Sequence, residues 1–341
     1  MKKVFRNFSA ALAAALALLV MAGASFAAES VYPVTIDNGN RQVVFEKAPE
    51  RVVTNGDSNI IELMFALGLD GRVIGHAGFN PSRMTVSDKY VERLSKLRMI
   101  SDDYITLEQL VGANPDMFLS GYFYGLDIPG DTSGSAITPD ELDKYGIKSY
   151  AITESLIRVM KKAPVSLEDT YTDLRNLGMI FNVQDEAAKV IDSMKARATA
   201  VTDKTSAVQE PLNVFILRVV TDGDVAIGSA PKTVGGQAMP SALTALAGGR
   251  NIFANIDDSW IKVTWEDVIG RDPDVIVILA YGVAIDCDKV AETLRHMPEL
   301  SGVKAVKNNR IYGTRVENTY PGPRAVDGLE ILAKFYHPEL F

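Results

Sequence analysis

Three tyrosines stand directly after apolar segments that resemble β-strands. Tyr122 and Tyr124 follow the run at residues 117–119, and Tyr281 follows the run at residues 275–280. A tyrosine ring offers a wide apolar surface and one polar hydroxyl, which together suit the binding of a small organic molecule. Residues at the carboxyl ends of parallel strands line the ligand sites of open α/β sheets. We therefore interpret these tyrosines as candidate ligand-binding residues.

No catalytic or metal-binding pattern accompanies the tyrosines. The G-x-G-x-x-G fingerprint of dinucleotide-binding enzymes is absent, and so is the G-x-S-x-G elbow of serine hydrolases. The three histidines are far apart in the sequence, and Cys287 is the only cysteine. Neither a multi-histidine metal site nor a disulfide is therefore expected. The sequence predicts no catalytic residue, no metal site and no cofactor, and we do not expect an enzyme.

The composition is that of an acidic globular protein. The chain has 341 residues, which suggests about two domains. Hydrophobic residues make up 47%, too many for a disordered chain. Lys and Arg total 35 against 43 Asp and Glu, a net charge of -8. A nucleic-acid surface needs an excess of clustered Lys and Arg, so nucleic acid is not an expected partner.

The first 27 residues are typical of a secretory signal peptide. Lys2 and Lys3 precede an apolar run at residues 11–23, and small residues stand around Ala27. We expect cleavage after Ala27 and export to the periplasm. No cysteine ends the apolar run, so the sequence predicts that the protein is not a lipoprotein.

Local patterns in the remaining chain alternate between strands and helices. Residues 32–45 read as a β-hairpin around Asn38-Gly39. Ser58 is a candidate cap for a helix that runs to about Leu67. Further strands are expected at 51–54, 73–75, 117–119, 213–219, 225–227, 275–280 and 310–312. Short strands that alternate with helices indicate parallel α/β sheets.

Two long helices are expected in the middle of the chain. Ser166 can cap a helix that extends to about Phe181. A second helix, at about residues 184–206, places apolar residues at three- and four-residue intervals. No Gly/Ser-rich or Pro-rich linker interrupts this stretch, which indicates a stiff connection between two α/β regions.

An internal similarity indicates that the two regions have the same design. At an offset of 158 residues, Thr106 matches Thr264, and both begin a helix with a capping pattern. In both copies a Pro-Asp turn (Pro115-Asp116 and Pro273-Asp274) and an apolar strand follow. We expect two similar α/β lobes that face each other across a ligand cleft. The predicted parts are a signal peptide (1–27), an N-terminal lobe (28–165), a connecting helical segment (166–210) and a C-terminal lobe (211–341).

Several short sequence motifs occur in a specific order along the chain. They are APERVV at 48–53, IIELMFALGL at 60–69, the two Pro-Asp strands, and AGGRNIFANI at 247–256. In this order they resemble a substrate-binding protein of an ATP-binding cassette (ABC) importer, of the helical-backbone class that serves ferric siderophores, cobalamin and haem. The resemblance covers nearly all of the chain after the leader. It implies two Rossmann-like lobes with parallel-sheet cores, joined by a rigid long helix.

The resemblance also implies where ligand and permease contacts lie. The ligand-binding residues that it implies, together with the tyrosines, are Asn55, Asp57, Arg83, Tyr122, Tyr124, Arg218, Trp260, Tyr281 and Arg324. The family docks on its permease through an acidic residue on each lobe, and in the first lobe Asp88 or Glu92 can serve. In the second lobe the segment 237–241 holds no acidic residue, so that contact stays unassigned.

The predicted function is therefore capture and delivery of a nutrient. The ligand is expected to be a ferric siderophore or a related metal-macrocycle, bound in the interlobe cleft by a monomer. The expected protein partner is an inner-membrane permease with its ATPase subunits. Cobalamin and haem are alternative ligands within the same fold. An exported α/β enzyme and a ligand sensor are alternatives of a different class.

Overall fold

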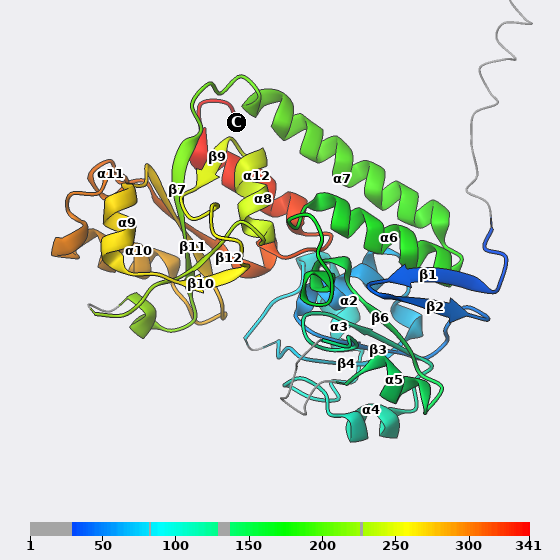
Figure 1. Cartoon of the computed structure of the whole chain (residues 1–341). Helices are drawn as coiled ribbons and strands as arrows, with labels where there is room; N and C mark the ends of the chain where they lie inside the picture. Colours follow the sequence, from blue (N-terminus) through cyan, green and yellow to red (C-terminus); the bar gives the residue numbers. More distant parts are fainter. Residues whose placement is uncertain (1–28, 82, 129–136, 226–227) are drawn as a thin grey trace, which may run out of the picture.

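The computed structural model describes residues 29–81, 83–128, 137–225 and 228–341. The predicted signal peptide lies outside these residues. The described chain forms two lobes, and a pair of long helices runs along one side of both (Figure 1). Among the described residues, no helix is long and apolar enough to cross a membrane. The two-lobed α/β fold predicted from the sequence is thus confirmed, whereas the residue boundaries given for its parts remain predictions.

The N-terminal lobe is built on a four-stranded parallel sheet. Its spatial order is β4 (Val73–Ala77), β3 (Val52–Asn55), β5 (Met117–Ser120) and β6 (Lys148–Ala151). The α-helices of this lobe are α2 (Ser58–Ala66), α3 (Val91–Ser95), α4 (Leu107–Ala113) and α5 (Pro139–Asp143). The predicted hairpin is present as β1 (Val34–Asn38) and β2 (Arg41–Phe45), paired antiparallel.

The C-terminal lobe has a sheet of parallel strands with an antiparallel edge. Parallel pairing joins β9 (Gly249–Asn251), β7 (Leu212–Val219), β11 (Val275–Ala280) and β12 (Ile311–Arg315). On the side of β7 away from β11, β8 (Lys232–Val234) pairs antiparallel with β7. β10 (Trp260–Lys262) pairs antiparallel with β8 and forms the edge. The helices are α8 (Met239–Leu246), α9 (Trp265–Arg271), α10 (Cys287–Arg295), α11 (Lys304–Lys307) and α12 (Ala325–Tyr336).

The predicted matching units are present in both lobes. Thr106 caps α4 and Thr264 caps α9, each through a reciprocal capping box with the residue three positions on. Each helix ends at a left-handed residue, Asn114 in one lobe and Asp272 in the other. The aspartate of each Pro-Asp turn then accepts a hydrogen bond from the backbone at the start of a neighbouring strand. The same local chemistry therefore fixes the entry to β5 and to β11.

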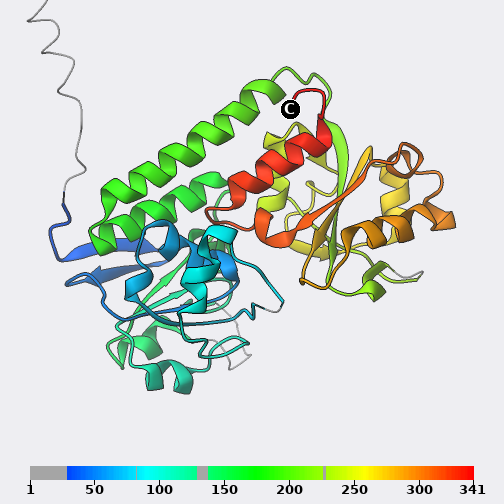
Figure 2. The same ribbon diagram turned by 180° about the vertical axis from the view of Figure 1, so that it is seen from behind.

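The two long helices bind the lobes into one body. They are α6 (Leu167–Phe181), capped by Ser166 as predicted, and α7 (Gln184–Thr205), and Figure 2 shows α7 beside α12 from behind. One cluster of buried apolar side chains continues from α2 through α6, α7 and α12 to the C-terminal sheet. Arg197 of α7 adds ion pairs to Asp327 at 2.6 Å and to Glu330 at 2.7 Å on α12. A continuous core without a flexible linker explains the stiff connection that the sequence predicts.

One local prediction is wrong. Ser58 is the first residue of α2 and not its cap; the N-cap is Asp57, whose side chain makes no capping hydrogen bond. Asp57 instead turns its carboxylate towards tyrosine hydroxyls, so the tertiary contact replaces the local one. Of the strand predicted at 225–227, residues 226–227 lie outside the described residues, and Val225 ends a 3₁₀ turn, Asp222–Val225, where the Asp224 carboxylate accepts backbone N–H groups.

Candidate ligand-binding cleft

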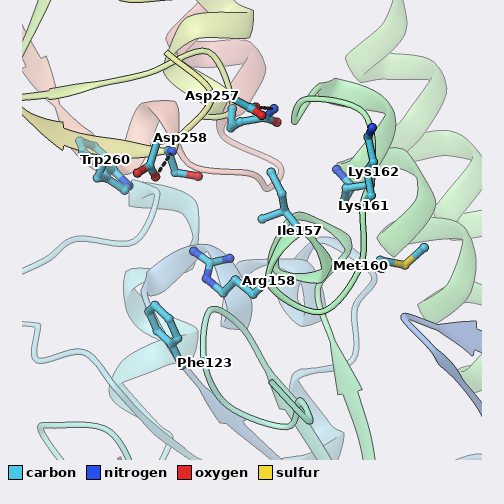
Figure 3. Close-up of a pocket in the computed structure, with 11 residues that line it drawn as sticks. Phe123, Ile157, Arg158, Met160, Lys161, Lys162, Asp257, Asp258 and Trp260 are labelled. Carbon is cyan, nitrogen blue, oxygen red and sulfur yellow. Dashed lines mark hydrogen bonds between the residues drawn. The ribbon is translucent and has the colours of Figure 1, made fainter. Parts of the chain in front are cut away.

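A cleft of about 740 Å³ opens between the lobes (Figure 3). One wall comes from the N-terminal lobe, from the turn after β5 and from the segment after β6. The other wall comes from the C-terminal lobe, from β10 and the residues just before it. The lining residues are Phe123, Ile157, Arg158, Met160, Lys161, Lys162, Gln237, Asp257, Asp258, Ser259 and Trp260. The N-terminal wall thus follows the carboxyl ends of parallel strands, as expected for this sheet architecture.

Aromatic side chains stand on both walls. Phe123 is 56% exposed and Trp260 is 38% exposed, which is unusual for such large apolar side chains. The Arg158 guanidinium lies 4.9 Å from the centre of the Phe123 ring, and the Arg218 guanidinium lies 5.4 Å from the Trp260 ring. Each wall therefore presents an aromatic ring supported by an arginine, a surface suited to a flat or partly apolar ligand.

A second, narrower crevice of about 100 Å³ lies between the lobes, and several polar side chains line it. Asp57, Arg83, Tyr104 and Tyr281 line it, and the Tyr281 hydroxyl lies 3.3 Å from Asp57 Oδ1. Burial raises the pKa of Asp57 to about 6, although hydroxyls of neighbouring tyrosines partly offset this effect. The pKa of this carboxyl group is therefore closer to neutral pH than that of an exposed aspartate.

Tyr122 has an unusual backbone conformation beside this crevice. Its φ is 63°, and its N–H donates to Ser155 Oγ at 2.5 Å. Its hydroxyl is buried and makes no well-formed hydrogen bond, although it is close enough to Asp57 to lower the pKa of that carboxyl. A non-glycine residue with positive φ and an unpartnered buried hydroxyl is a costly arrangement that clusters at functional sites.

The structure brings together five of the residues that the sequence analysis singled out. Asp57, Arg83 and Tyr281 line the crevice, and Trp260 lines the larger cleft. Arg218 joins the two groups, because its guanidinium lies 4.7 Å from the Tyr281 ring and also faces Trp260. Arg218 lies within β7, inside the strand that the sequence predicts at 213–219. Tyr122 stands beside the same cluster through Asp57.

Besides Arg218 and Tyr122, three further singled-out residues line neither opening. Asn55 is fully buried, and its Oδ1 accepts the Ile105 N–H at 2.9 Å, which ties β3 to the loop before α4. Tyr124 stacks on Tyr104 with 4.6 Å between ring centres. Arg324 donates to Thr85 O at 2.9 Å and lies 3.7 Å from the Glu62 carboxylate, so it joins the lobes behind the cleft.

Arg158, Lys161 and Lys162, which form part of the N-terminal wall, were not predicted from the sequence. These residues follow β6, a four-residue strand whose pattern is too short to stand out. Gly146 before the strand was the available signal, since glycine commonly ends the preceding helix. Asp257 and Asp258 were also missed, because they belong to a turn that is placed by the antiparallel edge of the second sheet.

The predicted docking residues lie on the surface of the N-terminal lobe. Asp88 is exposed in a 3₁₀ turn, and Glu92 is exposed in α3, where it pairs with Lys96 at 2.8 Å. Neither contacts the cleft. The structure describes no group of three or more His, Cys, Asp or Glu side chains that could hold a metal ion.

Two α/β lobes with a ligand-sized cleft between them define a two-lobed binding protein. Residues 53–317 match the model of the family described as periplasmic binding protein, and the chain belongs to this family. Its recognition as a substrate-binding protein of the ABC-importer type is thereby confirmed. Members of the family are transport proteins that bind substrates.

Known proteins similar to this chain span most of its length. One is the uncharacterized ABC transporter substrate-binding lipoprotein YvrC of Bacillus subtilis (strain 168), 25% identical over 315 residues, which cover 91% of this chain and 88% of YvrC. Another is a vitamin B12-binding protein of Photorhabdus laumondii, 26% identical over 68% of this chain and 71% of its own. A solved structure of an ABC-type Fe3+-hydroxamate transport system from Saccharomonospora viridis has a TM-score of 0.71 at 26% identity, over 90% of this chain and 99% of its own.

The comparison corrects the predicted localisation. YvrC is named a lipoprotein, which contradicts the prediction that the present protein is a non-lipidated protein of the periplasm. That prediction depended on the absence of a cysteine from the leader, a segment that lies outside the described residues. We withdraw it.

Proposed function

We propose that this protein captures a ferric siderophore or a related metal-macrocycle, such as cobalamin or haem, in its interlobe cleft and delivers it to an ABC permease. The observation that carries the proposal is the cleft itself. Its volume of about 740 Å³ is within the usual range for small-molecule sites, and aromatic residues line both walls. The names of similar proteins support iron-hydroxamate and B12 chelates as candidate ligands.

The chemistry of the cleft fits binding of an intact chelate. Phe123 and Trp260 provide apolar contact from opposite lobes, and the Arg158 and Arg218 guanidinium groups lie against these rings. The ligand keeps its metal within its own donor atoms, and the protein contacts the periphery. We propose no catalytic step.

Equilibrium dialysis tests the proposal, because the ligands carry their own absorbance. A neutral ferric trishydroxamate, cyanocobalamin and haem are dialysed separately against the protein. At least one is expected to bind with a Kd of about 1 μM or tighter. The Trp260→Ala variant is expected to weaken binding at least about tenfold. If none of the three compounds binds, the proposed ligand class is wrong.

A matched aromatic variant controls for general effects on the fold. Phe341 is 37% exposed, as Trp260 is, but it packs with Lys204 at the end of the chain and away from the cleft. Phe341→Ala is therefore expected to leave the Kd unchanged. An equal loss of affinity in both variants would show that the cleft is not the binding site.

We also propose that Asp88 and Glu92 contact the permease. Both are exposed on the N-terminal lobe and outside the cleft, so they are free to face a second protein. The double variant Asp88→Lys/Glu92→Lys is expected to abolish uptake by reconstituted permease while the ligand Kd stays the same. Glu186 is a matched control, since it too is a helical glutamate in an exposed local ion pair. Glu186→Lys should transport normally, and normal transport by the double variant would remove the assignment.

A further inference from the structure

The two walls of the cleft carry charges of opposite sign. Arg158, Lys161 and Lys162 stand on the N-terminal wall, and Asp257 and Asp258 stand on the C-terminal wall (Figure 3). A ligand in the cleft is therefore exposed to both signs at once, and which sign dominates depends on how many of these charges are already neutralised inside the protein.

Two of the three cations on the N-terminal wall have an internal partner. Arg158 lies 3.3 Å from the Glu154 carboxylate, and the side chains are 16% and 9% exposed. Lys162 lies 3.0 Å from Asp169, and both side chains are 13% exposed. The opposite charges of each pair lie so close together that their fields at the ligand largely cancel. Lys161 is exposed and forms no ion pair among the described residues.

The carboxylates of the cleft are not neutralised in this way. Asp257 accepts a hydrogen bond from the Gln237 side-chain amide, and Asp258 accepts one from the Ser259 N–H. Both are exposed, and within the described chain neither forms an ion pair with a lysine or an arginine. Their remaining acceptor positions point to N–H or O–H donors on a ligand.

The crevice adds further acidic groups. Asp57 and Asp103 line it together with one cation, Arg83, which donates to the Asp102 carbonyl at 2.9 Å. Arg218 is held against the Trp260 and Tyr281 rings. In the lining of the two openings, four carboxylates (Asp57, Asp103, Asp257, Asp258) and two cations (Lys161, Arg83) form no ion pair among the described residues, and a third such cation, Arg218, lies against the aromatic rings.

We propose that the cleft selects a chelate or macrocycle of low net charge that carries amide N–H or hydroxyl donors, and that it discriminates against polyanionic chelates. This inference rests on the proposed function and narrows its ligand class. A ferric tris-catecholate carries three negative charges and needs a clearly positive site, which this cleft does not provide. A neutral trishydroxamate or an amide-bearing corrinoid meets balanced charges, with acceptors at Asp257 and Asp258 and apolar rings at Phe123 and Trp260.

The test compares ligands of different charge on the full chain. Equilibrium dialysis uses a neutral ferric trishydroxamate, cyanocobalamin and a ferric tris-catecholate of charge 3−. The wild type is expected to bind one of the first two at least about tenfold more tightly than the tris-catecholate. The double variant Asp257→Asn/Asp258→Asn keeps the shape and removes two negative charges. Its affinity for the tris-catecholate is expected to rise at least about tenfold, while its affinity for the low-charge ligand falls, because an amide oxygen is a weaker acceptor than a carboxylate.

A control variant and the salt dependence separate local charge from net charge. Asp140 is 90% exposed at its side chain and far from the lining residues, so Asp140→Asn should change neither Kd. Added salt should weaken the discrimination against the tris-catecholate, because it screens the exposed carboxylates. A wild-type preference for the tris-catecholate, or a double variant that binds it no better, would overturn the inference. If neither these three ligands nor haem binds, the proposed function fails, and this inference fails with it; if haem alone binds, the proposed function stands and this inference fails.

Discussion

Arg324 of the C-terminal lobe lies 3.7 Å from Glu62 of the N-terminal lobe, and the two side chains are 12% and 0% exposed. Around this pair, Thr85 of the N-terminal lobe donates its N–H to Glu317 at 2.7 Å, and the Asn59 amide donates to Pro321 O at 2.6 Å. Buried polar groups from both lobes thus complete each other's hydrogen bonds. The arginine predicted to bind ligand is part of this interlobe contact instead.

Replacement of Arg324 by methionine should therefore weaken the fold and spare the cleft. The change leaves Glu62 buried without its cation, so we expect a loss of about 2–3 kcal/mol in the free energy of unfolding. Urea denaturation measures it. Arg93→Met is the control, because its pair with Asp70 is about 40% exposed on both sides and should cost less than about 0.5 kcal/mol. A large loss of ligand affinity with unchanged stability would instead return Arg324 to the binding site.

The same contact predicts a dependence of stability on pH. Burial raises the pKa of Glu62 from 4.5 to about 7, although Arg324, the Ser87 N–H and Lys89 partly counter this effect. Between these values the folded state holds more protons than the unfolded state, so this group's contribution to stability falls as pH rises from about 4.5 to 7. Asp57 and Asp173 have pKa values raised to about 6 and about 7, with the same sign. Urea midpoints should therefore decrease from pH 5 to pH 7.5.

The variant Glu62→Gln tests whether Glu62 causes this decrease of the urea midpoint with pH. Glutamine does not titrate, so the decrease in the urea midpoint between pH 5 and pH 7.5 should become shallower than in the wild type. The variants Asp57→Asn and Asp173→Asn should each reduce the slope by a further part. A slope that none of the three changes would contradict the assignment to buried carboxyl groups.

Tyr122→Phe separates ligand binding from stability. The hydroxyl is buried without a well-formed hydrogen bond, so its removal should leave the free energy of unfolding unchanged or raise it by up to about 1 kcal/mol. The phenyl ring retains the packing. Because the hydroxyl lies beside Asp57 at the crevice, the Kd of the bound chelate should rise about tenfold in the variant, measured by equilibrium dialysis. Tyr145→Phe is the control, since Tyr145 is an exposed tyrosine in the same lobe. Reduced stability with unchanged affinity would assign Tyr122 to the fold.

The two matching helix caps, at Thr106 and Thr264, should contribute equally to the free energy of unfolding. Thr106 accepts the Gln109 N–H at 3.2 Å, and Thr264 accepts the Asp267 N–H at 3.1 Å. Each Thr→Ala change is expected to cost about 1 kcal/mol. The caps are in different lobes, so the double variant should lose the sum of the two. Thr→Ser at either position should retain most of the stability, and a cost below about 0.3 kcal/mol for one cap would show that the two helix starts are not equivalent.

Local chemistry made the caps, the hairpin and the long helices predictable. Thr106, Ser166 and Thr264 act within three residues of themselves, and that range is readable in a sequence. The apolar periodicity of α7 is equally local. Two repeats of such units were sufficient to indicate two lobes.

Residues whose role depends on distant partners were harder to place. Asp57 accepts a hydrogen bond from Tyr281, 224 positions away, and does not cap its helix. Arg324 pairs with Glu62, 262 positions away. The wall at Arg158 depends on β6, which forms only beside β5. Residue type alone does not distinguish an arginine that faces a ligand from one that joins two lobes.

The interlobe contact also constrains how the two lobes evolve. Glu62 and Thr85 belong to one lobe, and their partners Arg324 and Glu317 belong to the other. A chimera that joined one lobe of this protein to the opposite lobe of a distant relative would keep both sheets intact but would lose these matched groups at the seam. Point changes on the exposed walls, at positions such as Asp258 and Lys161, leave these matched groups intact, whereas exchange of a whole lobe does not.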